Sequence, residues 1–309
     1  MNERQKILAE LKNAPEHTLS MRDLCKKKGK TAEEICRLLK ESPQGDPIFR
    51  ADGTVTLTRD VLTEENLLAH TPLAGLEILD SVDSTNAYLK RRVRELPDRY
   101  AVIALSQTMG RGRQGRHFFS DGRGLYMSLL LKPDQAGEEL TRITTMAAAA
   151  AALAGEEVTG QTMNIKWVND LYFRGRKIAG ILTEGVFTER PAVILGIGVN
   201  LFEPAGGFDP AVADVAGALF EKNNFLAEDF TAALLNRFFE FYEGRRDYLP
   251  EYRQRMMLLG QTVTYERNGS LFEARVLGVD DACRLLVDRE NHTEALFSGE
   301  ISLKTFDKC

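Results

Sequence analysis

Seven consecutive residues combine dense positive charge with glycine: Gly110-Arg111-Gly112-Arg113-Gln114-Gly115-Arg116. Glycine lets a backbone approach a ligand closely and adopt positive φ angles, and the guanidinium fork of arginine suits phosphate or carboxylate oxygens. The stretch lies between two apolar segments, 100–106 and 124–132, that are typical of strands. Its spacing matches neither a P-loop nor a Rossmann fingerprint. We therefore predict an ordered loop that binds an anionic ligand, with a solvated basic loop or an RNA-binding segment as the alternatives.

Two later segments place lysine beside apolar residues: Lys166-Trp167-Val168-Asn169-Asp170 and Lys177-Ile178-Ala179-Gly180-Ile181-Leu182. In the first, Trp167 and the preceding Ile165 alternate with Lys166 and Val168, which is typical of a strand with two distinct faces. A core tryptophan followed by an ordinary turn fits that pattern equally well. The second segment opens with a lysine, and such a strand end is usually only solvated. If Lys177 faces a pocket together with the arginine loop, it would stabilise negative charge on a transferring phosphoryl group.

Two further motifs consist of small or polar residues: Asp83-Ser84-Thr85-Asn86 and Gly196-Ile197-Gly198-Val199-Asn200. The first opens a predicted helix, so an ordinary N-cap is the favoured interpretation when the motif is taken alone. A helix N-terminus with hydroxyl groups can also hold a carboxylate or a ureido oxygen. The second ends an apolar strand, where small residues indicate either close packing or a sheet floor beneath a ligand.

A central domain over residues 76–258 is expected to position these motifs. The predicted strands and helices do not alternate in a strict βαβ order. This favours an α+β mixed sheet over a doubly wound fold. The expected strands are 75–79, 100–106, 124–132, 164–173, 177–184 and 192–202, and the expected helices are 85–94, 140–154 and 225–242. The helix over 140–154 is rich in alanine, so it should pack closely under the sheet.

A smaller domain is expected on each side of the central one. Residues 1–62 show three segments with helical spacing, then two short strand patterns around Ala51-Asp52-Gly53, which is the outline of a winged helix-turn-helix. Ser20 and Thr31 are expected N-caps, with Glu34 completing a capping box. Residues 63–75 are polar, contain proline and are interpreted as a linker. Residues 259–309 alternate with a period of two, which predicts an SH3-like barrel with strands at 262–266, 271–277, 284–288 and 293–297.

The composition is that of an ordinary soluble globular protein. The 309 residues are 43% hydrophobic and 28% charged, with a net charge of −5, which excludes a disordered chain and gives no general basic field for nucleic acid. The longest apolar run, 146–154, is too short to cross a bilayer, and no secretory signal is expected. The cysteines form no Cys-X-X-Cys pair, which indicates reduced thiols in a cytoplasmic protein; they are Cys25, Cys36, Cys283 and Cys309.

The five motifs occur in this order along one chain, and together with Gln107 they resemble the signature series of biotin protein ligases. The resemblance covers about residues 75–305 and includes a closing segment, Gly299-Glu300-Ile301-Ser302-Leu303. With the N-terminal region, the organisation resembles the three-domain bacterial type that doubles as a repressor of biotin genes. One departure is Val168, where the family usually has proline; valine keeps a backbone N–H that proline lacks.

The resemblance implies an ATP-dependent ligase that works in two steps. Biotin carboxylate attacks the α-phosphorus of ATP, and a specific lysine of the biotin carboxyl carrier protein of acetyl-CoA carboxylase then attacks the resulting biotinyl-5′-AMP. Because the first step brings like charges together, it requires preorganised cations. Mg²⁺ would arrive with ATP, and no cage of several carboxylates is apparent. A lipoate ligase on a related fold is the less favoured alternative, and a homodimer is expected only by analogy.

The resemblance also assigns roles to individual residues. It implies catalytic roles for Lys177, near the biotin carboxylate and α-phosphate, for Arg113, and for Asp170, which would orient the incoming lysine or the metal. The biotin head would be held by Ser84, Thr85, Asn86 and Gln107. The loop that closes over the ligand would use Arg111, Gly112, Arg113, Gly115 and Arg116. Further binding residues are Lys166, Trp167, Asn169, Gly180 and Asn200.

DNA binding stays open at this stage. A local basic patch could meet phosphates; its members are Lys26, Lys27, Lys28 and Lys30. The expected recognition helix over 31–40, however, begins with Glu33 and Glu34, where such a helix normally faces base edges. Carboxylates at that end also stabilise the helix itself. The sequence thus permits either a biotin-responsive repressor or an inherited winged helix that recognises no operator.

Overall fold

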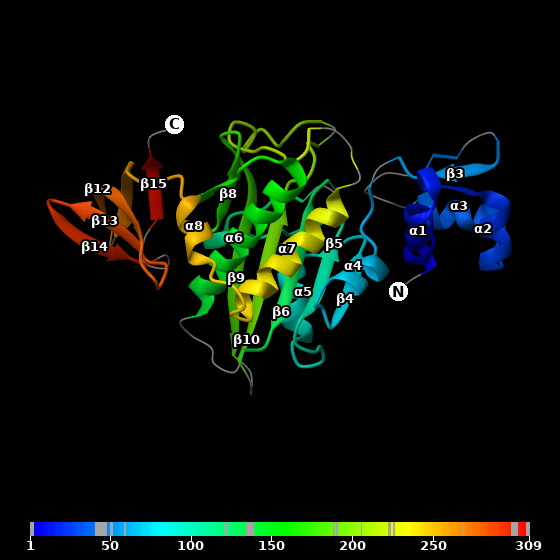
Figure 1. Cartoon of the computed structure of the whole chain (residues 1–309), viewed down its shortest axis with the longest axis horizontal. Coiled ribbons are helices and arrows are strands. Elements are labelled where there is room, and N and C mark those ends of the chain that lie inside the picture. Colours follow the sequence, from blue (N-terminus) through cyan, green and yellow to red (C-terminus); the bar gives the residue numbers. More distant parts are fainter. Residues whose placement is uncertain are drawn as a thin grey trace.

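The computed structural model arranges the chain as three parts in a row, with the N-terminal and C-terminal units on opposite sides of a central layered unit (Figure 1). No helix in the described part of the chain is long and apolar enough to cross a membrane. The described residues are 3–40, 48–49, 52–58, 60–120, 123–133, 139–187, 189, 191–204, 206–221, 224, 226–267, 269–297 and 302–306.

The central unit is built on a seven-stranded mixed sheet with the order β4-β5-β6-β10-β9-β8-β7. In this sheet β4 and β5 run parallel, and the other neighbouring strands are antiparallel, which confirms the expected α+β class. The strands are β4 Gly75–Leu79, β5 Tyr100–Ala104, β6 Leu125–Leu131, β7 Asn164–Lys166, β8 Asp170–Phe173, β9 Arg176–Phe187 and β10 Pro191–Val199.

One predicted strand is wrong. The segment 164–173 is two antiparallel strands, β7 and β8, with Lys166 paired to Asp170 across them. The chain reverses at Trp167, Val168 and Asn169, and the Trp167–Val168 peptide is cis. The apolar residues Ile165, Trp167, Val168 and Leu171 extend through this turn, so a strand assigned from apolar content does not reveal the reversal. Asn169 and Asp170, which are residue types favoured in turns, were the available signal.

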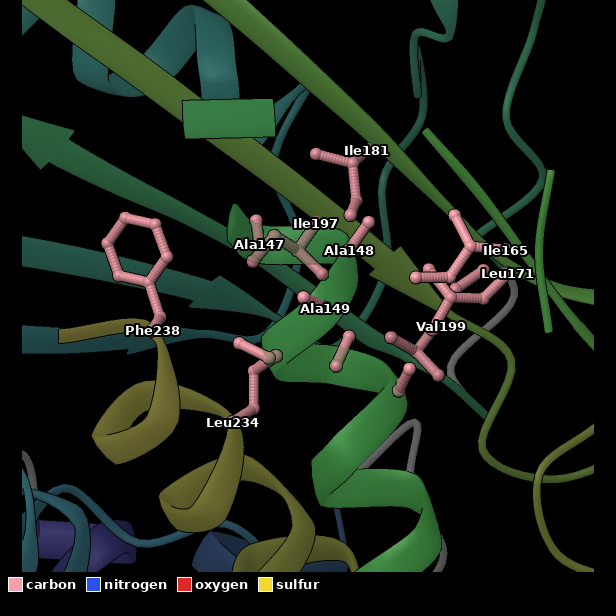
Figure 2. Packing of buried hydrophobic residues seen from close by; sticks show 14 of the residues in the cluster. Ala147, Ala148, Ala149, Ile165, Leu171, Ile181, Ile197, Val199, Leu234 and Phe238 are labelled. Carbon is pink, nitrogen blue, oxygen red and sulfur yellow. The ribbon is translucent and has the colours of Figure 1, made fainter. Parts of the chain in front are cut away.

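Helices cover both faces of the sheet. On one face lie α6 (Glu139–Thr159) and α7 (Ala227–Tyr242); on the other lies α5 (Thr85–Arg92). The alanines at 147–152 of α6 are at most 1% exposed, because their short side chains let the helix approach the sheet closely. Figure 2 shows three of these alanines beside Ile181 and Ile197 of the sheet, with Leu234 and Phe238 of α7 nearby. All three predicted helices of this unit are confirmed.

The N-terminal unit contains the three predicted helices and an antiparallel sheet with the order β1-β3-β2. Ser20 caps α2 by accepting from the Asp23 amide at 3.4 Å, and Thr31 with Glu34 forms the expected capping box. Ala51 of the predicted hairpin lies outside the described residues. The elements are α1 Glu3–Asn13, β1 Thr18–Ser20, α2 Met21–Lys28, α3 Ala32–Lys40, β2 Ile48–Phe49 and β3 Thr54–Thr56.

The expected linker over 63–75 is not a plain connector. It contains helix α4 (Glu64–His70), whose Leu67 is fully buried in the core of the central unit. The helix is only seven residues long and is followed by Pro72, so its apolar pattern is too short to stand out from a polar segment. The segment is therefore part of the folded central unit rather than a spacer.

The C-terminal unit is a five-stranded antiparallel sheet with the order β14-β13-β12-β11-β15, so the predicted β character is confirmed. The short helix α8 (Leu249–Gln254) before it was not predicted. The expected closing segment begins outside the described residues, at 299–301, and β15 starts at Ser302. The strands are β11 Thr262–Arg267, β12 Ser270–Val279, β13 Leu285–Arg289, β14 His292–Leu296 and β15 Ser302–Phe306.

Candidate active site

A cavity of about 680 Å³ opens on the face of the central sheet that carries α5. It brings together residues from all five motifs, although they are spread over more than a hundred positions of the chain. The predicted site residues that line it are Ser84, Thr85, Asn86, Gln107, Arg111, Gly112, Arg113, Arg116, Lys166, Trp167, Asn169, Asp170, Lys177, Gly180 and Asn200. Gly115 does not line the cavity; at φ +72° it allows the backbone turn of the arginine loop.

The arginine loop is ordered by its own backbone. The Gly112 amide donates to the Arg116 carbonyl at 2.7 Å, and the Phe118 amide donates to the Gly110 carbonyl at 3.0 Å. A Cβ at Gly110 would lie 2.3 Å from the Phe118 carbonyl oxygen, so this position requires glycine. Arg113 reaches the opposite wall, where its guanidinium donates to Asn169 Oδ1 at 3.3 Å. Burial lowers the pKa of Arg113, which matches a cation partly withdrawn from water.

The turn and strands after β7 form a charged corner of the cavity. Lys177 Nζ lies 2.7 Å from Asp170 Oδ1. Asp170 is paired with Lys166 on one side and with Gly180 on the other, so these residues share one face of the sheet. Burial lowers the pKa of Lys166, and burial together with the Asp170 charge raises the pKa of Tyr172 to about 12. Three cationic side chains and one carboxylate therefore converge where an anionic ligand would be stabilised.

Glycines of β10 make room for side chains that reach over the sheet. A Cβ at Gly198 would lie 2.5 Å from the ring of Phe118, and a Cβ at Gly196 would lie 2.3 Å from Asn86 Oδ1. Phe118, which the sequence analysis did not single out, follows the arginine loop and lines the cavity. This arrangement fits the interpretation of the motif at 196–200 as a sheet floor.

The polar motif at the start of α5 is held by a hydrogen-bond network. The Thr85 amide and hydroxyl both donate to Gln107 Oε1, at 2.8 and 3.1 Å, and Gln107 Nε2 donates to Ser120 Oγ at 2.9 Å. Ser84 makes no side-chain capping bond and lines the cavity instead, which argues against the simple N-cap interpretation. Asp83 points elsewhere: its two-bond contact with Arg91 lowers the pKa of Asp83 to about 2.

Trp167 is part of both the cavity wall and the hydrophobic core. It lines the cavity and is 7% exposed, and its indole N–H donates to the Cys283 carbonyl at 2.9 Å. Cys283 lies between β12 and β13, so this bond joins the cavity wall to the C-terminal unit. The Tyr252 hydroxyl donates to the Val168 carbonyl at 3.3 Å. The turn at Val168, where the sequence departs from the family's usual proline, is thus supported from outside the sheet.

Residues between Pro204 and Gly217, which the sequence analysis did not single out, form another wall of the cavity. The Lys177 amide donates to the Val215 carbonyl at 2.7 Å, and the Gly217 amide donates to the Lys177 carbonyl at 2.9 Å. The segment has no periodic pattern, and its contact with the site depends on pairing with a strand almost forty positions earlier. Its residues in the cavity lining are Pro204, Gly207, Phe208, Asp209, Val212, Val215 and Ala216.

The described lining contains two carboxylates, Asp170 and Asp209. Within the described ranges, no group of three or more His, Cys, Asp or Glu side chains could hold a metal ion by itself. The cavity therefore combines a polar end at α5, a glycine floor and a cationic corner. Such a cavity can bind a small molecule whose polar head lies at the α5 end. The acidic end of that molecule would then lie at the cationic corner, beside a second anionic group.

Comparison with known proteins agrees with this chemistry. The model of the "Biotin/lipoate A/B protein ligase family" matches residues 78–200, and that of the "Biotin protein ligase C terminal domain" matches residues 258–304. The "Bifunctional ligase/repressor BirA" of Bacillus subtilis is 30% identical over 239 residues, which cover 74% of this chain and 72% of that protein. The protein of the same description from Escherichia coli is 28% identical over 259 residues, covering 80% of each.

A solved structure, the biotin protein ligase from Aquifex aeolicus in complex with biotin and ATP, matches with a TM-score of 0.65 and 28% identity. The match covers 75% of this chain and 99% of that chain.

Proposed function

Because this chain belongs to the biotin protein ligase family, we propose that it joins biotin, by way of biotinyl-5′-AMP, to a specific lysine of the biotin carboxyl carrier protein of acetyl-CoA carboxylase. The observation that carries the proposal is the cavity in which residues of all five motifs meet. The C-terminal match to a biotin-specific domain favours biotin over lipoate. ATP and biotin, which occupy the Aquifex aeolicus structure by its description, are the proposed substrates.

The cationic corner would carry out the first step by lowering the repulsion between two anions. Lys177 and Arg113 come from opposite walls of the cavity, and Lys166 lies on the strand next to Asp170. The biotin carboxylate is itself the nucleophile, so the protein has to supply no attacking side chain. Positioning and positive charge are then the main contributions of the chain to the barrier.

Asp170 is proposed to act in the second step. Its carboxylate is paired with Lys177 and lies in the cavity lining, where it can orient the amine of an incoming carrier lysine. Mg²⁺ is proposed to arrive bound to the phosphates of ATP, since this ion typically uses one or two protein carboxylates together with substrate oxygens. Asp170 and Asp209 are the described lining residues that could receive it.

The proposed ligase activity can be tested with the purified full chain. With ATP, Mg²⁺, biotin and a carrier domain, we expect mass spectrometry to detect retained biotinyl-5′-AMP and a carrier heavier by one biotinyl group. Omitting the carrier should leave the adenylate in the protein. A parallel reaction with lipoate in place of biotin should give neither a lipoyl adenylate nor a carrier heavier by one lipoyl group. Absence of adenylate with biotin, or equal use of lipoate, would overturn the proposal.

We also propose that the N-terminal unit is a winged helix-turn-helix that binds DNA, because both BirA proteins are described as repressors. The helices α2 and α3, which Gly29 at φ +62° helps to connect, and the β1-β3-β2 sheet support this assignment. Two of the four patch lysines, Lys27 and Lys28, pair with Glu10 at 3.2 and 2.6 Å, which reduces the basic patch.

We therefore expect weak DNA binding that depends on biotinyl-5′-AMP and on low salt. A gel shift with the DNA upstream of the gene that encodes this chain tests it, with a Lys26→Ala, Lys30→Ala double variant as the comparison. No shift at low salt, with or without biotinyl-5′-AMP, would rule out the repressor role and leave a ligase in the cytoplasm, where ATP is supplied.

A further inference from the structure

We propose that Glu184 and Ser128 are positioning residues that fix the orientation of the Asn86 amide in the biotin-binding end of the cavity. Both residues are absent from the described lining, whereas Asn86 is part of it. The inference rests on the proposed function, because it assigns Asn86 to biotin. Neither Glu184 nor Ser128 belongs to a motif that the sequence analysis singled out.

The side chain of Asn86 is held from two strands. Its Nδ2 donates to Glu184 Oε2 on β9 at 2.7 Å, and its Oδ1 accepts from the Ser128 hydroxyl on β6 at 2.5 Å. Gly196 of β10 lies between these strands and has no side chain, which leaves the space that Oδ1 occupies. Ser128 is fully buried, and its single hydroxyl hydrogen lies between Asn86 Oδ1 and Thr85 Oγ1, which is 2.7 Å from Ser128 Oγ.

Glu184 determines which end of the amide faces which strand. A carboxylate only accepts hydrogen bonds, so the amide nitrogen of Asn86 must face Glu184, whereas the Ser128 hydroxyl could either donate or accept. The second hydrogen on Nδ2 points to the Leu182 carbonyl at 3.4 Å. The capacity that remains on Asn86 is therefore a lone pair on Oδ1. A ligand would meet an acceptor here, which suits an N–H donor such as those of the biotin ureido ring.

Lys90, which also contacts Glu184, offers a way to test whether Glu184 orients the Asn86 amide. Its ammonium lies 2.5 Å from Glu184 Oε1, so the two carboxylate oxygens are divided between Lys90 and Asn86. In Glu184→Gln, only one oxygen remains, and Lys90, which can only donate, will take it. The new amide NH₂ then faces Nδ2 of Asn86, and two donors oppose each other. Asn86 is expected to turn over and present its nitrogen where the ligand needs an oxygen.

Isothermal calorimetry of biotin binding to the full chain distinguishes this mechanism from a general structural role. We expect Glu184→Gln to weaken biotin binding about tenfold, the equivalent of one well-placed hydrogen bond. Lys90→Met alone should change it by less than about threefold, since Glu184 still accepts from Asn86. Combining Lys90→Met with Glu184→Gln should recover most of the loss, because the introduced glutamine can then turn its oxygen toward Asn86. Ser128→Ala should also weaken biotin binding.

The KM for ATP and the rate at saturating biotin should stay unchanged in these variants. If Glu184→Gln binds biotin as tightly as the unmodified chain, the inference is wrong. It is equally wrong if the double variant is weaker than Glu184→Gln, or if the ATP constant shifts by the same factor, because either result indicates independent structural losses. Failure of the unmodified chain to bind biotin would instead contradict the proposed function itself.

Discussion

Replacing Lys177 by methionine is expected to slow the formation of biotinyl-5′-AMP by about 10²–10³-fold, the usual effect of removing one preorganised charge from a polar transition state. Methionine has a similar length and leaves the backbone pairing of this residue with Val215 and Gly217 in place. The loss should therefore reflect charge rather than a collapsed wall. Single-turnover release of pyrophosphate at saturating ATP and biotin measures it. Adenylate formation at the rate of the unmodified chain would show that Lys177 is not the cation that acts in this step.

Asp170→Asn is the matched control, because it breaks the same 2.7 Å ion pair from its other side while keeping the lysine charge. If Asp170 orients the carrier lysine, adenylate should still form in this variant and accumulate, since only its transfer to the carrier is slowed. If Asp170 instead holds the metal, adenylate formation should fall and recover at higher Mg²⁺. A variant with both steps at normal rates would remove Asp170 from the mechanism.

Sequence motifs predicted most of the residues that share the cavity, because each motif is confined to a few neighbouring positions. The arginine loop, the glycine-containing end of β10 and Lys177 near the start of β9 are each recognisable within a few residues, and the cavity brings them together. Apolar runs also predicted most strands of the central sheet, because one face of the sheet packs on α6 and α7 while the other faces the cavity or α5. Such patterns involve only residues that are neighbours in the sequence, so they can be recognised without the folded structure.

What the sequence could not predict depends on contacts between distant segments. The wall at 204–216 belongs to the site only because its backbone pairs with Lys177. Glu184 is an ordinary partly exposed residue of a strand, and its role appears only when α5 is placed above it. Likewise, the reversal at Trp167 is supported by Tyr252 and Cys283, more than 80 positions later. No periodicity along the chain encodes such pairings.

A buried charge network between the N-terminal and central units is another feature of this kind. Lys12 of α1 lies 2.5 Å from Asp60 and 3.0 Å from Glu228 of α7. The Asp60 side chain is completely buried, and Glu228 also accepts from the Thr63 amide at 2.7 Å, at the start of α4. One ammonium group thus offsets two carboxylates that have little access to water. It connects the first helix of the chain, the segment before α4 and a helix of the central core.

Lys12→Met should therefore reduce the free energy that holds α1 against the central unit by about 3–5 kcal/mol, the cost of leaving a buried charge without its partner. Hydrogen exchange of the α1 and α4 amides, together with limited proteolysis of residues 57–63, measures this change. Lys6→Met is the matched control on the same helix: Lys6 pairs with Glu3, and both side chains are more than 40% exposed, so it should leave exchange and cleavage unchanged. Equal protection in the two variants would mean that the N-terminal unit is held by apolar packing instead. If Lys12→Met does release α1, the same variant will show whether ligase activity requires the N-terminal unit to be docked.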